Sequence, residues 1–187
     1  AFQPIRRPGV PNVKAAARVR TSIDVFLLAR MQPRQLQFAP DADKVTLIRR
    51  ACLDLIGLPP TPKQLKQFLD DRSDQAWDKL IDRLLASPRY GERMAQHWLD
   101  VVRFAESDGY REDAFRPDAH RYRDYVIRSF NEDKPYDEFV REQIAGDLLP
   151  SRNDDERWEK TIATGYIAIS RRIGVSPHNL RPITIED

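Results

Sequence analysis

Hydrophobic residues recur every three or four positions along most of the chain, which is the spacing of a helix with one buried face. A clear example is the run KVTLIRRACLDLI, which follows two candidate capping residues, Asp41 and Asp43, and stops at Gly57. Aspartate is a favoured N-cap, and glycine is favoured just beyond the last helical residue. The pattern therefore predicts a helix that ends on a left-handed glycine.

Serine or threonine precedes several of the other apolar patterns, where it can cap the first turn of a helix. The strongest signal is at Thr61, because proline follows it and Gln64 stands three residues on, which makes a capping box with proline at the first helical position. A long helix is expected to run to about Glu106. The expected N-caps are Ser22, Thr61, Ser73 and Ser87.

The pattern as a whole predicts an all-α fold. Further helices are expected over 117–131, 135–147 and roughly 155–171, whereas strand-like alternation is weak and confined to 182–186. About seven or eight short capped helices predict a compact bundle, irregular rather than simply up-and-down. Residues 1–20 hold three prolines and scattered basic residues, typical of an extended lead-in or linker. Residues 21–187 are expected to form a single helical domain.

Composition excludes several classes of protein. There are 31 Lys and Arg residues against 29 Asp and Glu, interleaved along the chain, so no basic face for nucleic acid is expected. No apolar run approaches the roughly 20 residues of a membrane span. The single cysteine, Cys52, lies in an apolar helical pattern and is expected to be a buried, unreactive thiol.

The segment from Gly91 to Pro150 is rich in Arg, Asp, Tyr, His and Trp, whose side chains fix geometry through ring faces and planar or short polar groups. A helical wheel places His97 on an apolar arc with Trp98. Asp100 follows one turn later and Arg103 one turn further. A carboxylate at that spacing can hold a histidine in one tautomer. Two interpretations stay open: a structural buried histidine, or an oriented base.

The helix over 117–131 is expected to bring an arginine towards the carboxylates of the preceding helix and loop. We therefore predict one partly buried polar network, whose members are also the candidate catalytic residues. They are His97, Asp100, Arg103, Asp113 and Arg123.

The loop after the long helix is acidic, and Glu106, Asp108 and Asp113 are weak candidates for metal ligands. The spacing of an EF-hand loop is missing, so no metal is expected. The alternative is a turn whose carboxylates meet nearby arginines. The chain also has no Gly-rich phosphate loop, no zinc-binding cysteine set and no Cys-x-x-Cys-His haem motif, so no cofactor is expected in this fragment.

Several motifs, in a fixed order over about residues 20–187, are similar to a family of unknown function found in large planctomycete proteins. The motifs are IDVFLLAR from Ile23, DLIGLPPTP from Asp54, LLASPRYGER from Leu84, HWLD from His97, RYRDYV from Arg121, FNEDKPYD from Phe130 and QIAGDLLP from Gln143.

The resemblance implies a planctomycete-type cytochrome c domain before this region and a second uncharacterised domain after it. In the family, a segment like Thr184-Ile185-Glu186-Asp187 typically continues to a Cys-x-x-Cys-His motif, so this chain is expected to be truncated at its C-terminus. Haem c is then expected in the parent protein, and the neighbouring domains are the expected partners. Because c-type haem is attached outside the cytoplasm, the resemblance also implies a periplasmic or otherwise extracytoplasmic location.

Two functions follow from these observations, and whether the protein is an enzyme stays open between them. The first is an accessory or structural helical module of an exported, cytochrome-c-linked multidomain protein of unknown activity. The alternative is part of the catalytic site of an extracytoplasmic enzyme, with polysaccharides as candidate substrates. A pocket lined by His97, Asp100, Arg103 and Arg123 would favour the enzyme. A packed core of ion pairs would favour the accessory module.

Overall fold

The computed structural model describes residues 3–4, 6–14, 16–109 and 113–168. Within these residues every regular element is a helix, and the one β-type pairing is an isolated antiparallel bridge between Ser107 and Phe115. The predicted all-α class is therefore confirmed. The weak strand signal at 182–186 lies outside the described residues. In the described part of the chain, no helix is both long and apolar enough to cross a membrane.

The chain divides into two compact units, Ala1–Asp43 and Lys44–Asp187. The first unit holds the short 3₁₀ helix η1 (Ala16–Arg18), helix α1 (Ser22–Met31) and the 3₁₀ helix η2 (Gln32–Arg34). Thr21, not Ser22, caps α1, because Asp24 three residues on completes a capping box with the threonine. A domain boundary at residues 20 and 21 stays a prediction.

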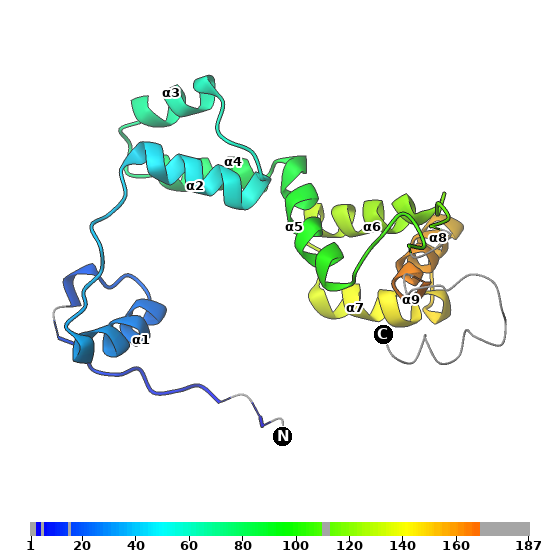
Figure 1. Ribbon diagram of the computed structural model, residues 1–187, viewed down its shortest axis with the longest axis horizontal. Helices are drawn as coiled ribbons and strands as arrows, with labels where there is room; N and C mark the ends of the chain where they lie inside the picture. Colours follow the sequence, from blue (N-terminus) through cyan, green and yellow to red (C-terminus); the bar gives the residue numbers. More distant parts are fainter. Residues whose placement is uncertain (1–2, 5, 15, 110–112, 169–187) are drawn as a thin grey trace. The chain divides into compact units, whose positions relative to one another are not determined.

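The second unit contains the remaining helices (Figure 1). Helix α5 contacts α2 and also packs against α6, so it joins the first helices of this unit to the last ones. The elements are α2 (Lys44–Ile56), α3 (Pro62–Asp70), α4 (Ala76–Leu85), α5 (Pro88–Val101), α6 (Ala119–Asn131), α7 (Tyr136–Ala145), η3 (Gly146–Leu148), α8 (Asp154–Ala163) and α9 (Gly165–Ala168).

Three of the predicted start and stop signals operate as expected. The Thr61 side chain accepts a hydrogen bond from the Gln64 amide in a full capping box, and Ser87 caps α5 ahead of Pro88. Gly57, just after α2, has a φ of +69°. Ser73 does not cap α4. That helix begins three residues later, because the Ser73 carbonyl accepts the Ala76 amide in a preceding turn.

Helix α5 stops at Val101 rather than near Glu106, because the chain turns back on itself at Arg103, which has a φ of 55°. The Arg103 amide bonds the Asp100 carbonyl, and the Phe104 amide bonds the Leu99 carbonyl at 2.9 Å. This pair of bonds is a Schellman motif, which satisfies the last carbonyls of the helix. Glycine usually occupies this left-handed position, so an arginine there gave no stop signal in the sequence.

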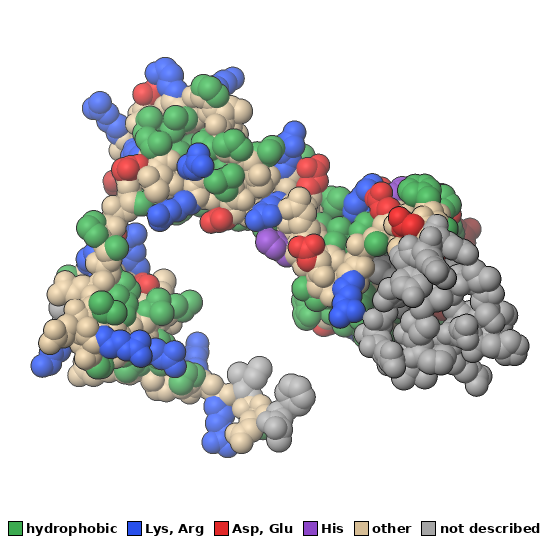
Figure 2. All heavy atoms as spheres, viewed as in Figure 1, with side chains coloured by type: hydrophobic (Ala, Val, Ile, Leu, Met, Phe, Trp, Pro, Cys, Tyr) green, Lys and Arg blue, Asp and Glu red, His purple; other side chains and the backbone are tan. Residues whose placement is uncertain are grey.

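The described residues of the second unit form two clusters of buried side chains. The first joins α2, α3 and α4 around Ile48, Cys52 and Leu84. The second joins α5 to α8 around Ala95, Tyr125 and other residues of α6, α7 and α8. Cys52 is fully buried, as predicted, and burial raises the pKa of its thiol. On the outside, acidic and basic side chains are interspersed over the face shown in Figure 2.

In the second cluster, α5 and α6 cross at close range. The Gly91 amide donates to Asn131 Oδ1 at 2.8 Å, and Asn131 Nδ2 donates to the Pro88 carbonyl at 3.1 Å. A Cβ atom on Gly91 would lie 2.4 Å from the Ile127 carbonyl oxygen. The two backbones can approach this closely only because residue 91 has no side chain.

Candidate functional site

His97 lies on the outer face of α5 and is exposed. The inner face carries Gly91 and Ala95, which are buried, together with Trp98 and Val102, which pack partly buried against the second cluster. At 100° per residue, His97 lies about 200° from Ala95, on the opposite side of the helix. The expectation of a buried His97 is wrong, because the contact with α6 selects the face containing Gly91.

The predicted network around His97 does not form as one group. Asp100 is exposed, and in the described part of the chain no hydrogen bond joins it to His97. Arg103 is exposed too, and its backbone forms the Schellman turn at the end of α5. The structure therefore gives His97 no orienting carboxylate from Asp100.

Arg123 does reach the acidic loop, as predicted. Its Nη1 atom lies 2.5 Å from Glu106 Oε1, and its Nε atom lies 3.2 Å from Asp124 Oδ1. Both side chains of the Arg123–Glu106 pair are more than a third exposed. An ion pair with this much solvent contact stabilises a protein by about 0–1 kcal/mol. Its main effect is to tie the loop to α6.

The other carboxylates of the acidic loop close the loop on itself. Asp108 Oδ1 lies 2.5 Å from Arg116 Nε, and the Gly109 amide donates to Asp113 Oδ1 at 2.9 Å. Hydrogen bonds from the Ser107 side chain and the Gly109 amide lower the pKa of Asp113. The carboxylates therefore hold a turn, which is the structural alternative that the sequence left open.

The three candidate metal ligands are not brought together. Glu106, Asp108 and Asp113 each use an oxygen on a different partner: Arg123, Arg116 and the Gly109 amide. Among the described residues, no three His, Cys, Asp or Glu side chains gather closely enough to hold a metal ion.

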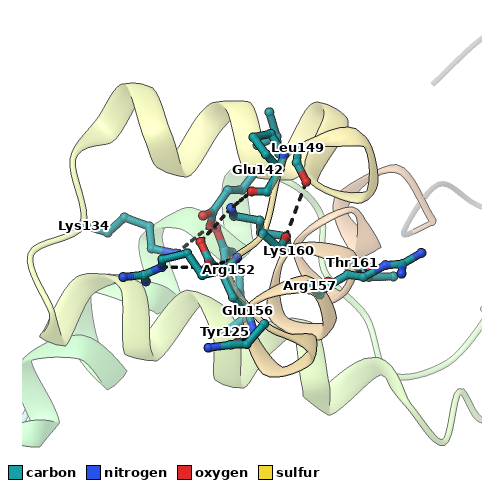
Figure 3. A network of polar contacts seen from close by, with 12 residues as sticks. Tyr125, Lys134, Glu142, Leu149, Arg152, Glu156, Arg157, Lys160 and Thr161 are labelled. Atoms are coloured by element: carbon teal, nitrogen blue, oxygen red, sulfur yellow. Dashed lines mark hydrogen bonds and ion pairs between the residues drawn. The ribbon is translucent and has the colours of Figure 1, made fainter.

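A buried polar group that the sequence did not reveal lies between α6 and α7. Glu142 is only 3% exposed, and its Oε2 atom accepts hydrogen bonds from Tyr125 Oη at 2.7 Å and from Lys134 Nζ at 2.6 Å. Figure 3 shows the Lys134 side chain reaching towards Glu142. The Lys134 ammonium also lies 4.9 Å from the centre of the Tyr125 ring. Burial and then the hydrogen bond to Glu142 raise the pKa of Tyr125.

A second buried group lies beside it. Trp98 Nε1 donates to Tyr122 Oη and to Gln143 Oε1, both at 3.0 Å, and the Tyr122 hydroxyl donates to the same Gln143 oxygen at 2.5 Å. Burial raises the pKa of Tyr122 to about 12, so the phenol stays protonated at neutral pH. Glu142 and Gln143 follow Phe139 by three and four residues. That position on the apolar stripe of α7 was the one available sequence signal.

A third polar group binds the start of α8 to the loop that precedes it. Glu156 accepts hydrogen bonds from Lys160 Nζ at 2.8 Å and from the Arg152 amide and Nε (Figure 3). These bonds lower the pKa of Glu156 to about 2, and the bond from Lys160 has the largest effect. Lys160 is largely buried, and its Nζ atom also donates to the Pro150 carbonyl. The carboxylate and ammonium groups here connect the loop after η3 to α8.

Described residues of the second unit line two sizeable cavities. One of about 720 Å³ is bounded by Phe104, Trp158, Asp108 and Arg116, among other residues. One of about 240 Å³ is bounded mainly by aromatic rings. Neither is lined by His97, Asp100, Arg103 or Arg123. The geometry therefore supplies two concave surfaces but no acid–base pair from the predicted network.

Comparison with known proteins adds a family. No curated protein and no solved structure matches the chain. The model of the PSCyt2 family, described as a protein of unknown function (DUF1549), matches residues 22–185. This match confirms the family resemblance carried by the sequence motifs. The chain belongs to the PSCyt2 family of proteins of unknown function.

Proposed function

We propose that this chain is an accessory helical module of an exported multidomain protein that carries c-type haem on a different segment. The family name, PSCyt2, is consistent with an association with cytochrome c. The motif resemblance supports the same context, with a cytochrome c-type domain as the expected neighbour. Export follows in this proposal, because c-type haem is attached outside the cytoplasm.

The accessory role is supported mainly by the buried and partly buried carboxylates, which are hydrogen-bonded to other groups of the chain. The buried Glu142 binds Lys134 and Tyr125, and Glu156 binds Lys160 and its own loop. Groups satisfied in this way hold helices together. A catalytic acid or base needs in addition a proton-transfer partner within hydrogen-bond reach in an accessible site.

A part in an extracytoplasmic active site, with polysaccharides as candidate substrates, is the second proposal. It is favoured by the cavity of about 720 Å³, where Asp108 and Arg116 stand beside the rings of Phe104 and Trp158. Concave sites that combine apolar walls with a few polar groups are typical of ligand binding.

The test uses the natural polypeptide, expressed in a host that attaches c-type haem in the periplasm. A matched version replaces residues 21–187 with a flexible linker. The accessory role predicts a Soret band in both proteins, and neighbouring domains that proteases separate faster in the linker version. A natural polypeptide that stays in the cytoplasm or shows no haem band would overturn the proposal.

The second proposal makes a different prediction for Asp108→Asn. The release of reducing sugar ends should then fall while the helical content, followed by far-ultraviolet circular dichroism, stays unchanged. Activity that persists in Asp108→Asn, or that the natural polypeptide lacks, would remove the catalytic alternative.

A further inference from the structure

The smaller cavity, of about 240 Å³, lies where α5, the end of α6 and the start of α7 meet. We call it the aromatic cavity, because five of its lining side chains are aromatic. They are Tyr90, Trp98, Phe130, Tyr136 and Phe139. It is smaller than the roughly 300–1,000 Å³ of pockets for drug-sized ligands, so its volume suits a compact molecule.

Two pairs of rings in the aromatic cavity pack edge to face. The Trp98 ring lies 6.4 Å from the Tyr136 ring at 81° and 4.9 Å from the Phe139 ring at 66°. Tyr136 is 70% exposed, so one wall is accessible to solvent. Ring faces carry partial negative charge and attract a cation placed over them.

Lys134 also lines the aromatic cavity, but its charge is already balanced. Its Nζ atom lies 2.6 Å from the buried Glu142 carboxylate and points towards it in Figure 3. Its side chain is only 16% exposed. Lys134 and Glu142 together add no net charge.

Asp133 supplies the unbalanced charge of the lining. It is exposed, and no ion pair within the described residues takes up its carboxylate. It occupies the left-handed position of the stop that ends α6, with a φ of 50°, where its amide bonds the Phe130 carbonyl. The Lys134 amide bonds the Ser129 carbonyl in the same turn. The turn thereby fixes the backbone that carries Asp133 beside the aromatic walls.

We propose that the aromatic cavity binds a compact organic cation of the methylated ammonium class. Ring faces together with one carboxylate are complementary to a charge spread over methyl groups. An inorganic cation such as Mg²⁺ or Ca²⁺ requires several oxygen ligands, which aromatic walls do not offer. An anion would meet the unpaired charge of Asp133. This proposal does not depend on the accessory role.

The first experiment compares choline with 3,3-dimethylbutan-1-ol, its uncharged carbon isostere, by titration into the full chain. Bound choline methyl protons should shift upfield under the ring currents, and the Trp98 indole N–H resonance should move with saturation. Because the rings attract only the charged ligand in this way, the isostere should bind about tenfold more weakly, which corresponds to about 1.4 kcal/mol. Equal affinities, or no saturable choline binding, would overturn the proposal.

Variants then assign the binding to the aromatic cavity. Tyr136→Leu should weaken choline binding about fivefold to tenfold, whereas Tyr136→Phe should retain it, because the ring face is what binds. Asp133→Asn should weaken binding about threefold to fivefold, and asparagine tolerates the left-handed conformation. Glu132→Gln removes the same charge one residue away and should have no effect. If Asp133→Asn and Glu132→Gln behave alike, the carboxylate does not belong to the site.

Discussion

Replacing Glu142 with glutamine tests whether the buried ion pair holds α6 and α7 together. The substitution keeps the shape of the side chain and removes its charge. Lys134 then keeps an ammonium that is only 16% exposed and has lost its carboxylate partner. Tyr125 keeps a carbonyl oxygen as its hydrogen-bond acceptor. The damage is therefore concentrated on the charge of Lys134.

The expected magnitude follows from these contacts. Removing one member of a buried ion pair costs about 3–5 kcal/mol, because the other charge stays buried without a partner. Since the Tyr125 bond survives in neutral form, we expect about 3 kcal/mol for Glu142→Gln. The double variant Lys134→Met/Glu142→Gln removes the stranded cation and should recover about half of this loss.

Urea unfolding at pH 7, followed by far-ultraviolet circular dichroism, measures these free energies. The control is Asp70→Asn in the exposed pair with Lys66, whose side chains are 64% and 78% exposed. An exposed pair contributes little, so the control should stay within about 0.5 kcal/mol of the parent chain. If Glu142→Gln is as mild as Asp70→Asn, the buried pair does not hold α6 and α7 together.

Three further predictions concern packing and protonation. Gly91→Ala should lower the free energy of unfolding by about 2–3 kcal/mol in the same urea assay, because the added Cβ would overlap the α6 backbone. Gly9→Ala is the control and should be neutral, because nothing lies near that residue. Equal losses of stability in the two variants would refute the close crossing. The pKa of Glu156 is about 2 in the folded chain against an ordinary 4.5, so its stabilisation should be complete above pH 4.5 and vanish towards pH 2. The urea midpoints of the parent chain and Glu156→Gln should therefore converge over that range, and a constant difference would contradict the assignment. Tyr122 and Tyr125 should remain protonated at pH 11, because burial raises the pKa of both phenols. The NMR shifts of their ring carbons measure the protonation state. Ionisation of either phenol near pH 10 in the folded chain would count against its burial.

Local signals made two of the helix starts predictable. Thr61 and Ser87 each precede a proline, and a cap and a proline act within one turn, so no distant contact is needed to interpret them. The stop after α5 was not predictable in the same way. Arg103 adopts a conformation that glycine prefers, and only the surrounding hydrogen bonds show it.

The candidate site was less predictable, because it depends on which helix face becomes buried. Two arcs of α5 carry apolar residues, one through Val101 and one through Ala95 and Leu99. The contact of Gly91 with α6 selects the second arc, so Val101 is exposed and His97 lies outside. The partners of Glu142 come from other elements, so its burial could not be derived from α7 alone.

The continuity of α5 also makes it one stiff element between two helices of the second unit. Its 14 residues form one unbroken helix of about 21 Å that contacts α2 as well as α6. A stiff rod of this kind has no hinge at which a tilt could be absorbed. The contacts with α2 and with α6, the latter at the Gly91 crossing, are therefore made to one rigid element.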